Sequence, residues 1–208
     1  MKILVIGAGN MGASFVKQLR AAGHQVSVTA RDMAKAQALA QQHGAIAVPA
    51  SHSAQDVAAV VVATPYAAAV AALRSVGNLA GKAVIDITNP LTPDYMGLTI
   101  GHSTSAAEEI ARALPGVDIV KGFNTIFAQL LAEGANLGHG QKATVFLASD
   151  SETAKQTAGA LAESMGFQTQ DVGGLKNARY LEPLAGLNIY LGYGAGLGTG
   201  IAPAWIRK

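Results

Sequence analysis

Three glycines near the beginning of the sequence, Gly7, Gly9 and Gly12, directly follow the apolar run 3–6. An amphipathic pattern comes next, and this glycine spacing between a strand and a helix is typical of a dinucleotide-binding turn. Gly7 permits the tight turn, Gly9 lets a pyrophosphate approach the backbone, and Gly12 lets the helix pack closely on the strand. The free N–H groups at the start of that helix then face the phosphates. The predicted binding loop consists of Gly7, Gly9, Asn10, Met11 and Gly12. The alternative is a glycine turn that binds no ligand.

The end of the second predicted strand indicates which dinucleotide binds. Enzymes that use NAD usually place an acidic residue there, about 20 residues past the glycines, to hold the ribose 2′-hydroxyl. Here the strand ends in Thr29-Ala30-Arg31, and Arg31 offers a planar cation that suits a 2′-phosphate. Lys35, one helical turn later, adds a second positive charge. Asp32 is expected to cap the helix 33–42 instead of holding a ribose. We therefore predict NADP(H), held by Thr29, Arg31 and Lys35, and the alternative is a solvated helix start.

Three later strands end in loops rich in proline, amide and hydroxyl groups: Ala63-Thr64-Pro65, Thr88-Asn89-Pro90 and Phe123-Asn124-Thr125. Ligands of a doubly wound sheet bind at the carboxyl ends of its strands. Prolines stiffen the walls of a nicotinamide pocket, and the asparagine amides can bind a carboxamide or a flat heterocycle. We expect the cofactor to contact Ala63, Thr64, Pro65 and Asn89, and the electron acceptor to contact Asn89, Pro90, Asn124 and Thr125. Each asparagine has a loop cap as its alternative role.

Acid–base groups are scarce at these strand ends. The pattern places no Lys, Arg or His at the strand tips and only Asp94 as an acid, so no catalytic acid or base is assigned. Hydride transfer between two redox cofactors needs positioning more than proton transfer, which favours a flavin or deazaflavin as acceptor. The five histidines have no metal-like spacing, so no metal is expected. His24 and His139 are interpreted as surface loop residues, and His102 is the histidine with a chance of reaching the site.

Composition is that of a soluble enzyme with a sizeable core. The chain has 208 residues, half of them hydrophobic, with a net charge of +2 and no cysteine. These values disfavour nucleic-acid binding and exclude disulfides and thiolate chemistry. Met1 lies almost inside the first strand, so we expect no signal peptide and a cytoplasmic location. The uncharged stretch 183–206 is long enough to span a membrane, but its glycines and prolines indicate a buried or partner-covered segment.

Alternating strand and helix patterns predict an α/β fold, a doubly wound Rossmann-type sheet, mainly parallel, with helices on both faces and a short C-terminal helical segment. We expect a binding domain over 1–174 and a dependent C-terminal segment over 175–208. A capping box at Ser105-x-x-Glu108 opens one helix. The expected strands are 2–6, 25–29, 45–48, 58–63, 82–87, 117–122, 143–149 and 167–172. The expected helices are 10–22, 33–42, 66–76, 105–114, 126–133, 152–165 and 175–191, the last interrupted near Pro183.

The motifs together resemble the short NADP oxidoreductases, typified by the NADPH-dependent reductase of the deazaflavin coenzyme F420 and by the cytoplasmic reductase domain of the STEAP metalloreductases. The resemblance rests on Gly9-Asn10-Met11-Gly12, Thr29-Ala30-Arg31 with Lys35, Thr64-Pro65-Tyr66, the segment 121–126, and the closing pattern 173–182. It implies a 2′-phosphate site at Arg31 and Lys35 and a nicotinamide wall at Pro65. The deazaflavin reductases carry His where this chain has Asn124, so a deazaflavin, a flavin or a small organic acceptor stays open.

Two other functions are compatible with the same cofactor site. A reductase of imine, pyrroline-carboxylate or β-hydroxyacid substrates is disfavoured, because such enzymes append a long helical domain for which few residues remain. A non-catalytic NADP sensor is the second.

The glycines of the C-terminal segment suggest a partner. Gly192, Gly196 and Gly200 are spaced by four residues and share one face if 191–201 is helical. We therefore expect a homodimer in which this tail packs on the second subunit and walls the acceptor pocket. A tail folded onto its own core is the alternative.

Overall fold

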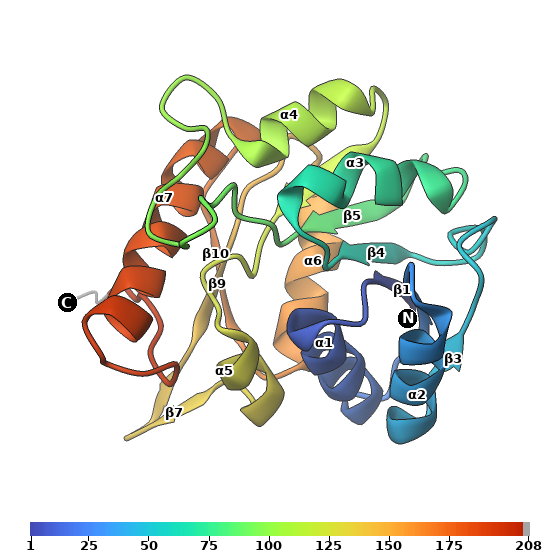
Figure 1. Cartoon of the computed structure of the whole chain (residues 1–208), viewed down its shortest axis with the longest axis horizontal. Helices are drawn as coiled ribbons and strands as arrows, with labels where there is room; N and C mark the ends of the chain where they lie inside the picture. The colour runs from blue at the N-terminus through green and yellow to red at the C-terminus, as the bar shows by residue number, and fades with distance from the viewer. Residues whose placement is uncertain (206–208) are drawn as a thin grey trace.

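A six-stranded parallel sheet forms the centre of the computed structural model, which describes residues 1–205 (Figure 1). The strand order is β3-β2-β1-β4-β5-β6, the doubly wound order with its switch point between β1 and β4. The strands are β1 (Lys2–Ile6), β2 (Gln25–Thr29), β3 (Ile46–Ala47), β4 (Ala59–Val62), β5 (Ala83–Asp86) and β6 (Asp118–Lys121). The predicted fold class is confirmed.

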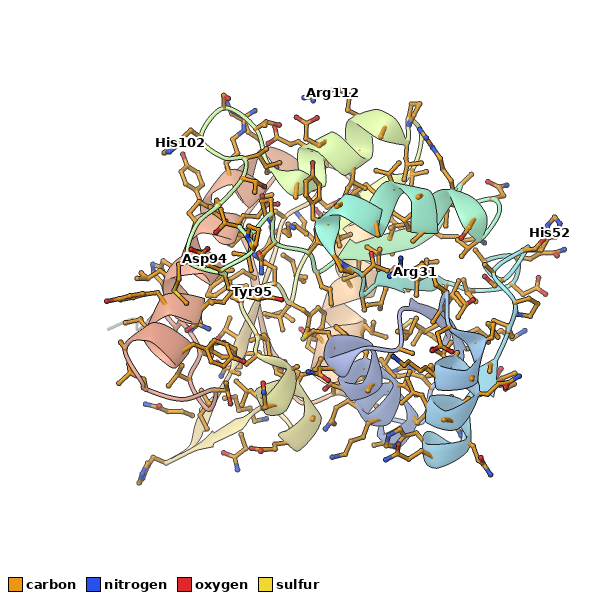
Figure 2. All side chains as sticks on the ribbon, viewed as in Figure 1. Arg31, His52, Asp94, Tyr95, His102 and Arg112 are labelled. Carbon is orange, nitrogen blue, oxygen red and sulfur yellow. The ribbon has the colours of Figure 1, made fainter. Side chains whose placement is uncertain are left out.

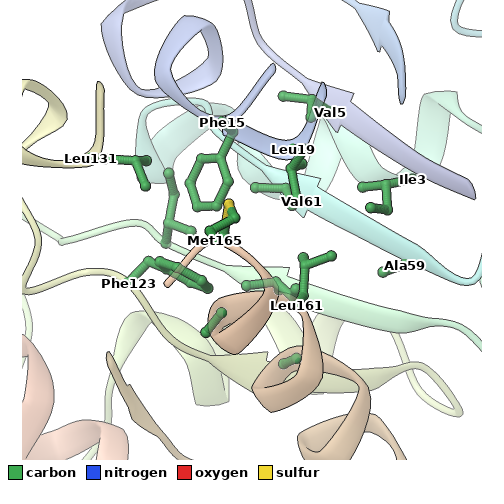
Figure 3. Close-up of a cluster of buried hydrophobic side chains, with 14 of the residues drawn as sticks. Ile3, Val5, Phe15, Leu19, Ala59, Val61, Phe123, Leu131, Leu161 and Met165 are labelled. Atoms are coloured by element: carbon green, nitrogen blue, oxygen red, sulfur yellow. The ribbon is translucent and has the colours of Figure 1, made fainter. Parts of the chain in front are cut away.

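Helices cover both faces of this sheet because its strands are apolar on both sides. Along β1, Ile3 and Val5 join one core cluster, whereas Leu4 and Ile6 join the other. The first cluster includes Phe15 and receives α1, α2, α5 and α6; the second receives α3 and α4. Figure 3 shows part of the first cluster. The helices are α1 (Asn10–Ala21), α2 (Met33–His43), α3 (Tyr66–Ser75), α4 (Ala106–Ala113), α5 (Ala128–Glu133), α6 (Glu152–Ser164) and α7 (Ala178–Ile189).

The last two predicted strands form, but outside the six-stranded sheet. β9 (Thr144–Leu147) and β10 (Gln168–Asp171) make their own parallel pair. One antiparallel bridge, between Lys121 and Ala148, connects this pair to β6. A small hairpin of β7 (Asn136–Gly138) and β8 (Gln141–Lys142) precedes β9 and was not expected from the sequence.

The C-terminal segment corrects two expectations. After the 3₁₀ turn η1 (Leu175–Asn177), α7 runs through Pro183 without a break. Proline removes only one helical hydrogen bond there, and buried residues on both sides, such as Leu181 and Ala185, hold the helix on the core. Helical structure then ends in the π-helical turn η2 (Tyr190–Gly194), so 191–201 is not a helix.

The tail glycines therefore do not share a helix face. Gly196 has φ +75 and nothing within 4 Å of the place of a Cβ. Gly192, by contrast, packs inside the molecule, because a Cβ there would lie 2.6 Å from Phe127 Cζ. The start of the tail is thus folded onto Phe127, the N-cap of α5, as in the alternative given above. Residues 206–208 of the predicted segment lie outside the described residues. Within residues 1–205 no helix combines the length and hydrophobicity that a membrane crossing requires.

His24 is buried, so its interpretation as a surface residue is wrong. Its side chain is 7% exposed, with Nδ1 3.1 Å from the Met1 amino nitrogen and Nε2 2.8 Å from Ser164 Oγ. The ring sits where β1, β2 and the end of α6 meet. His139 is exposed, as expected.

Acidification should destabilise the protein through His24. Burial, and then the positive Met1 amino group, lower the pKa of His24 below 6.5. The unfolded chain therefore binds a proton on His24 at higher pH than the folded chain, and stability falls as the pH drops from about 6.5 toward the folded-state pKa. The urea midpoint should decrease between about pH 7.5 and about pH 5.5, and the decrease should be smaller in His24→Gln. An equal decrease in both proteins would assign the effect to another group.

Candidate functional site

The three motif glycines have two different structural roles. A Cβ on Gly7 (φ +119) would collide with the Ala63 carbonyl, and a Cβ on Gly12 would collide with the Gly7 carbonyl. Gly7 N–H donates to Thr29 O at 2.8 Å, which fixes the turn against β2. Gly9 differs, since no atom lies within 4 Å of where its Cβ would stand. Two glycines thus let β1, α1 and β4 pack closely, and the third leaves open space at the helix start.

The N-terminus of α1 is suited to an anion. Gly9 is its N-cap, no side chain caps it, and its first turn holds no acidic residue. The first N–H groups of a helix have no intrahelical partner, so here they are available to phosphate oxygens. Asn10 is exposed and Met11 half-buried at this end.

At the end of β2, the acidic residue Asp32 caps the next helix, as expected, and does not project freely from the strand end. Asp32 caps α2, accepting from the N–H groups of Ala34 and Lys35 at 3.1 and 3.2 Å. Arg31 and Lys35 are exposed, whereas Thr29 is buried and its hydroxyl has no protein partner. In the view of Figure 2, Arg31 lies between α2 and α3, whereas Asp94 and Tyr95 lie near α7. Lys35 Nζ lies 4.0 Å from Asp32 Oδ2, so the exposed guanidinium of Arg31 is the cation that best fits a 2′-phosphate.

At the end of β4, the chain turns directly into α3. Ala63 N–H donates to Ile6 O at 2.8 Å, so β4 stays paired with β1 up to the glycine turn. Thr64 is half-buried, and Pro65, exposed, is the N-cap of α3 with φ −55. Tyr66 follows, and its pKa is raised by burial and then by nearby carboxylates, Glu109 first.

Asn89 and Asn124 meet across the ends of β5 and β6. Asn124 Nδ2 donates to Asn89 Oδ1 at 3.0 Å and to Leu181 O at 2.9 Å, while Asn89 Nδ2 donates to Asn124 O at 2.9 Å. The structure brings the two predicted residues together, although their amides bond to each other. Beside them, Pro90 O accepts from Thr99, and Thr125 O accepts from Asn188 Nδ2 at 3.1 Å.

A buried ion triad lies at the same strand ends. Lys121 Nζ is 2.7 Å from Asp86 Oδ2 and 2.9 Å from Glu182 Oε1, and all three side chains are at most 1% exposed. Burial alone would lower the pKa of Lys121, but the two carboxylates raise it above its ordinary value. Lys121 is therefore a cation.

The triad corrects the expectation that these strand tips carry no lysine and only Asp94 as an acid. Asp86 and Lys121 are the last residues of β5 and β6, and Glu182 lies on α7. The available signal was a single charge inside each apolar run, in Val84-Ile85-Asp86-Ile87 and Ile119-Val120-Lys121. Such a charge is almost never buried without a partner.

A second ion pair joins α4 to α7. Arg179 donates to both carboxylate oxygens of Glu108, at 2.9 and 2.6 Å, and this contact is the main cause of the lowered pKa of Glu108. Ser105 caps α4 as predicted, since Glu108 N–H donates to Ser105 Oγ at 3.2 Å. The second half of the predicted capping box differs, because the Glu108 carboxylate accepts from Ser105 Oγ at 2.7 Å and from Arg179. His102 is exposed. Among residues 1–205, no group of three or more His, Cys, Asp or Glu side chains could hold a metal ion.

Comparison with known proteins identifies the family to which the chain belongs. A model of the family "NADP oxidoreductase coenzyme F420-dependent" matches residues 2–90. The F420-dependent NADP reductase of Methanothermobacter marburgensis is 32% identical over 209 residues, covering 92% of this chain and 92% of the relative. The chain belongs to this family. It is an NADP-dependent oxidoreductase, as the resemblance described above implied.

Two further relatives show how far the similarity extends. A solved structure of a proposed F420-dependent NADP reductase from Arthrobacter sp. FB24 is 30% identical, with a TM-score of 0.88 and complete coverage of both chains. Metalloreductase STEAP3 of Rattus norvegicus is 30% identical over 190 residues, but the chain spans only 36% of its length. An imine reductase from Pseudomonas sp., 19% identical with a TM-score of 0.69, shares the fold alone.

Valine at Gly9 and valine at Gly12 should have different effects. Gly9 has extended backbone and free space around it, so Gly9→Val should fold with an unchanged Tm. It should nevertheless lose NADPH affinity by about 10-fold or more, because its side chain fills the space over the start of α1. Gly12→Val should be strongly destabilised by collision with the Gly7 carbonyl. Thermal unfolding and NADPH fluorescence titration measure both effects. A folded Gly9→Val protein with full NADPH affinity would make the motif purely structural.

Proposed function

We propose that the chain transfers hydride between NADP(H) and a deazaflavin or flavin acceptor. One observation carries the proposal: the buried charged groups at the ends of β5 and β6, Asp86, Lys121 and Glu182, are paired with one another. They are therefore not free to exchange protons with a substrate, which suits hydride transfer between two redox cofactors. The relatives named F420-dependent NADP reductases support coenzyme F420 as the acceptor.

The cofactor is proposed to lie across the switch point between β1 and β4. The pyrophosphate would lie on the start of α1, the 2′-phosphate at Arg31 and Lys35 beside Thr29, and the nicotinamide against Pro65. The open space at Gly9 and the unpartnered Thr29 hydroxyl support this placement. The bound NADP(H) supplies or takes the hydride. The proposed contacts of the cofactor are Gly7, Gly9, Asn10, Met11, Gly12, Thr29, Arg31, Lys35, Ala63, Thr64, Pro65 and Asn89.

The acceptor is proposed to lie on Asn89, Pro90, Asn124 and Thr125. Amide groups can bind the polar edge of a flat heterocycle, and the Asn89–Asn124 pair fixes their direction. In this proposal the protein aligns the nicotinamide ring with the ring of the acceptor, and no side chain acts as an acid or a base.

A panel of acceptors tests the proposed function. NADPH oxidation is measured with FMN, FAD, riboflavin and coenzyme F420 in parallel, and a cyclic imine serves as the comparison substrate. We expect turnover with F420 or a flavin and none with the imine. Tight NADPH binding without oxidation by any acceptor would indicate a sensor, and oxidation by the imine alone would indicate the other class of reductase.

Arg31 should set the preference for NADPH over NADH. A charge-assisted bidentate contact to the 2′-phosphate contributes about 1.5–3 kcal/mol, or roughly 10- to 150-fold in affinity. Arg31→Ala should remove most of this preference and leave NADH binding nearly unchanged. The control is Arg112→Ala, an exposed arginine on α4 paired with Glu109. Equal affinities of the unmutated protein for the two cofactors would contradict the assignment.

We further propose that the protein is a homodimer in which residues 175–205 pack on the second subunit and form one wall of the acceptor pocket. The exposed side of α7 and η2 is apolar, with Tyr180, Leu187 and Tyr190 all more than half exposed, and such surfaces often mark partner contacts. Light scattering should give twice the chain mass of 21.1 kDa. Leu187→Lys should shift the mass toward the monomer, whereas Ile46→Lys should not, because Ile46, also more than half exposed, lies on the edge strand β3. A monomeric unmutated protein would rule the dimer out.

A further inference from the structure

Three fully buried charges are a costly feature that stability does not explain. A buried ion pair generally stabilises a fold no more than well-packed apolar side chains of the same volume. Asp86, Lys121 and Glu182 nevertheless occupy the ends of β5 and β6 and the inner side of α7. What distinguishes a charge cluster from apolar packing is direction, because each hydrogen bond fixes the angle and the distance of its partners.

Lys121 is held on three sides. Its ammonium group has three N–H donors, and they meet Asp86 Oδ2 at 2.7 Å, Thr88 O at 2.6 Å and Glu182 Oε1 at 2.9 Å. Asp86 and Lys121 are register partners on neighbouring strands. In addition, Asp86 Oδ1 accepts from Thr88 N–H at 2.9 Å. The loop that leads to Asn89 is therefore bound at both polar groups of the Thr88 backbone.

Glu182 extends the cluster to two helices. Its carboxylate accepts from Ala106 N–H at 2.8 Å and from Ala107 N–H at 3.1 Å, the first two residues of α4. These N–H groups have no intrahelical partner. Glu182 therefore accepts hydrogen bonds from the start of α4 and also neutralises the charge of Lys121. The preceding residue, Leu181, accepts from Asn124 Nδ2. One turn of α7 thus contacts both the ion triad and the asparagine pair.

We propose that Lys121 and Glu182 are positioning residues for hydride transfer. They fix the ends of β5 and β6 against α7, and thereby set the place and direction of the Asn89 and Asn124 amides that meet the acceptor. The inference rests on the proposed function, because it requires the acceptor to bind at these two asparagines. Neither Lys121 nor Glu182 contacts the acceptor in this scheme.

The charge balance of the cluster provides a specific signature. Two carboxylates face one ammonium, and the partial positive charge at the start of α4 offsets part of the excess. Without Lys121, the two carboxylates would stay buried without the cation that both of them contact, so acceptor turnover should acquire a new dependence on pH. Among the described residues, Tyr66 on α3 is coupled electrostatically to all three charges of the cluster and to Glu109 on α4. The Glu108–Arg179 pair joins α4 and α7, the two helices that meet at Glu182.

The experiment compares Lys121→Met and Glu182→Gln with the control Lys155→Met. Lys155 also bridges two carboxylates, Glu152 and Asp171, and its side chain is 10% exposed, but it lies on α6 beside β10. We expect kcat/KM for the acceptor to fall about 10- to 100-fold in both test variants and about twofold or less in the control. NADPH affinity should fall by about fivefold or less in the two test variants, because Asn89 is the one proposed cofactor contact that the cluster positions, and should stay within about twofold in the control. Only Lys121→Met should show the new pH dependence.

A second readout does not depend on turnover. In the unmutated protein the Asn124 side-chain amide donates to two acceptors, so its NMR signal should exchange slowly with solvent. The exchange should become faster in both test variants and stay slow in Lys155→Met. If no acceptor is turned over by the unmutated protein, the proposed function fails, and this exchange measurement alone decides whether the triad positions Asn124.

Three results would overturn the proposal: folded test variants with unchanged acceptor kcat/KM, unchanged amide exchange, or an equal loss of NADPH and acceptor affinity. The last would indicate a general structural role. If Lys121→Met does not fold, Glu182→Gln, which preserves shape and volume, decides on the same criteria.

Discussion

Lys121 carries a positive charge at a place that water does not reach. This constraint determines how the carboxyl ends of β5 and β6, where the acceptor is proposed to bind, are held against α7. The charge has to be neutralised by groups that the chain brings to it, and those groups come from β5 and from α7, 61 residues later in the sequence. Because Glu182 also satisfies the open N–H groups of α4, the same contact closes the start of that helix. The Glu108–Arg179 pair then ties α4 and α7 a second time. The C-terminal helix is thus fixed to the sheet by charge and direction, even though it contributes no strand to it.

The proposed cofactor site, at β1, α1 and the end of β2, depends on close backbone packing and not on buried charges. Gly7 and Gly12 have no room for a Cβ, so β1, α1 and β4 approach one another as closely as backbone atoms allow. What remains at Gly9 and the start of α1 is a surface of N–H groups, with no acidic residue in the first turn of the helix. Such a surface binds a phosphate through its backbone, and side chains are needed only at the end of β2, where Arg31 and Lys35 are exposed.

The comparisons agree with this division. The family model matches residues 2–90, which contain the glycine turn, Arg31 and Pro65. Asn124, Lys121 and Glu182 lie beyond that range, in the part of the chain that the F420-dependent NADP reductase relatives also cover. The chain spans 36% of the length of STEAP3, so the similarity to that relative concerns one portion of a longer protein. The distant imine reductases share the sheet and its helices but not the level of identity that would carry an activity.

The sequence by itself determined the sheet, the glycine turn, the Asp32 and Ser105 caps and the family. These features are local, since each depends on residues within one strand, one turn or one helix start, and their spacing is visible in the chain. Tertiary structure decided what distant residues do to one another. It placed β9 and β10 outside the main sheet, carried α7 through Pro183, buried His24, ended the tail helix at Gly194, and joined Asp86, Lys121 and Glu182. A single charge in an apolar strand shows that a partner is needed, but only the fold determines which residue supplies the opposite charge, because the partners lie on elements far apart in the sequence.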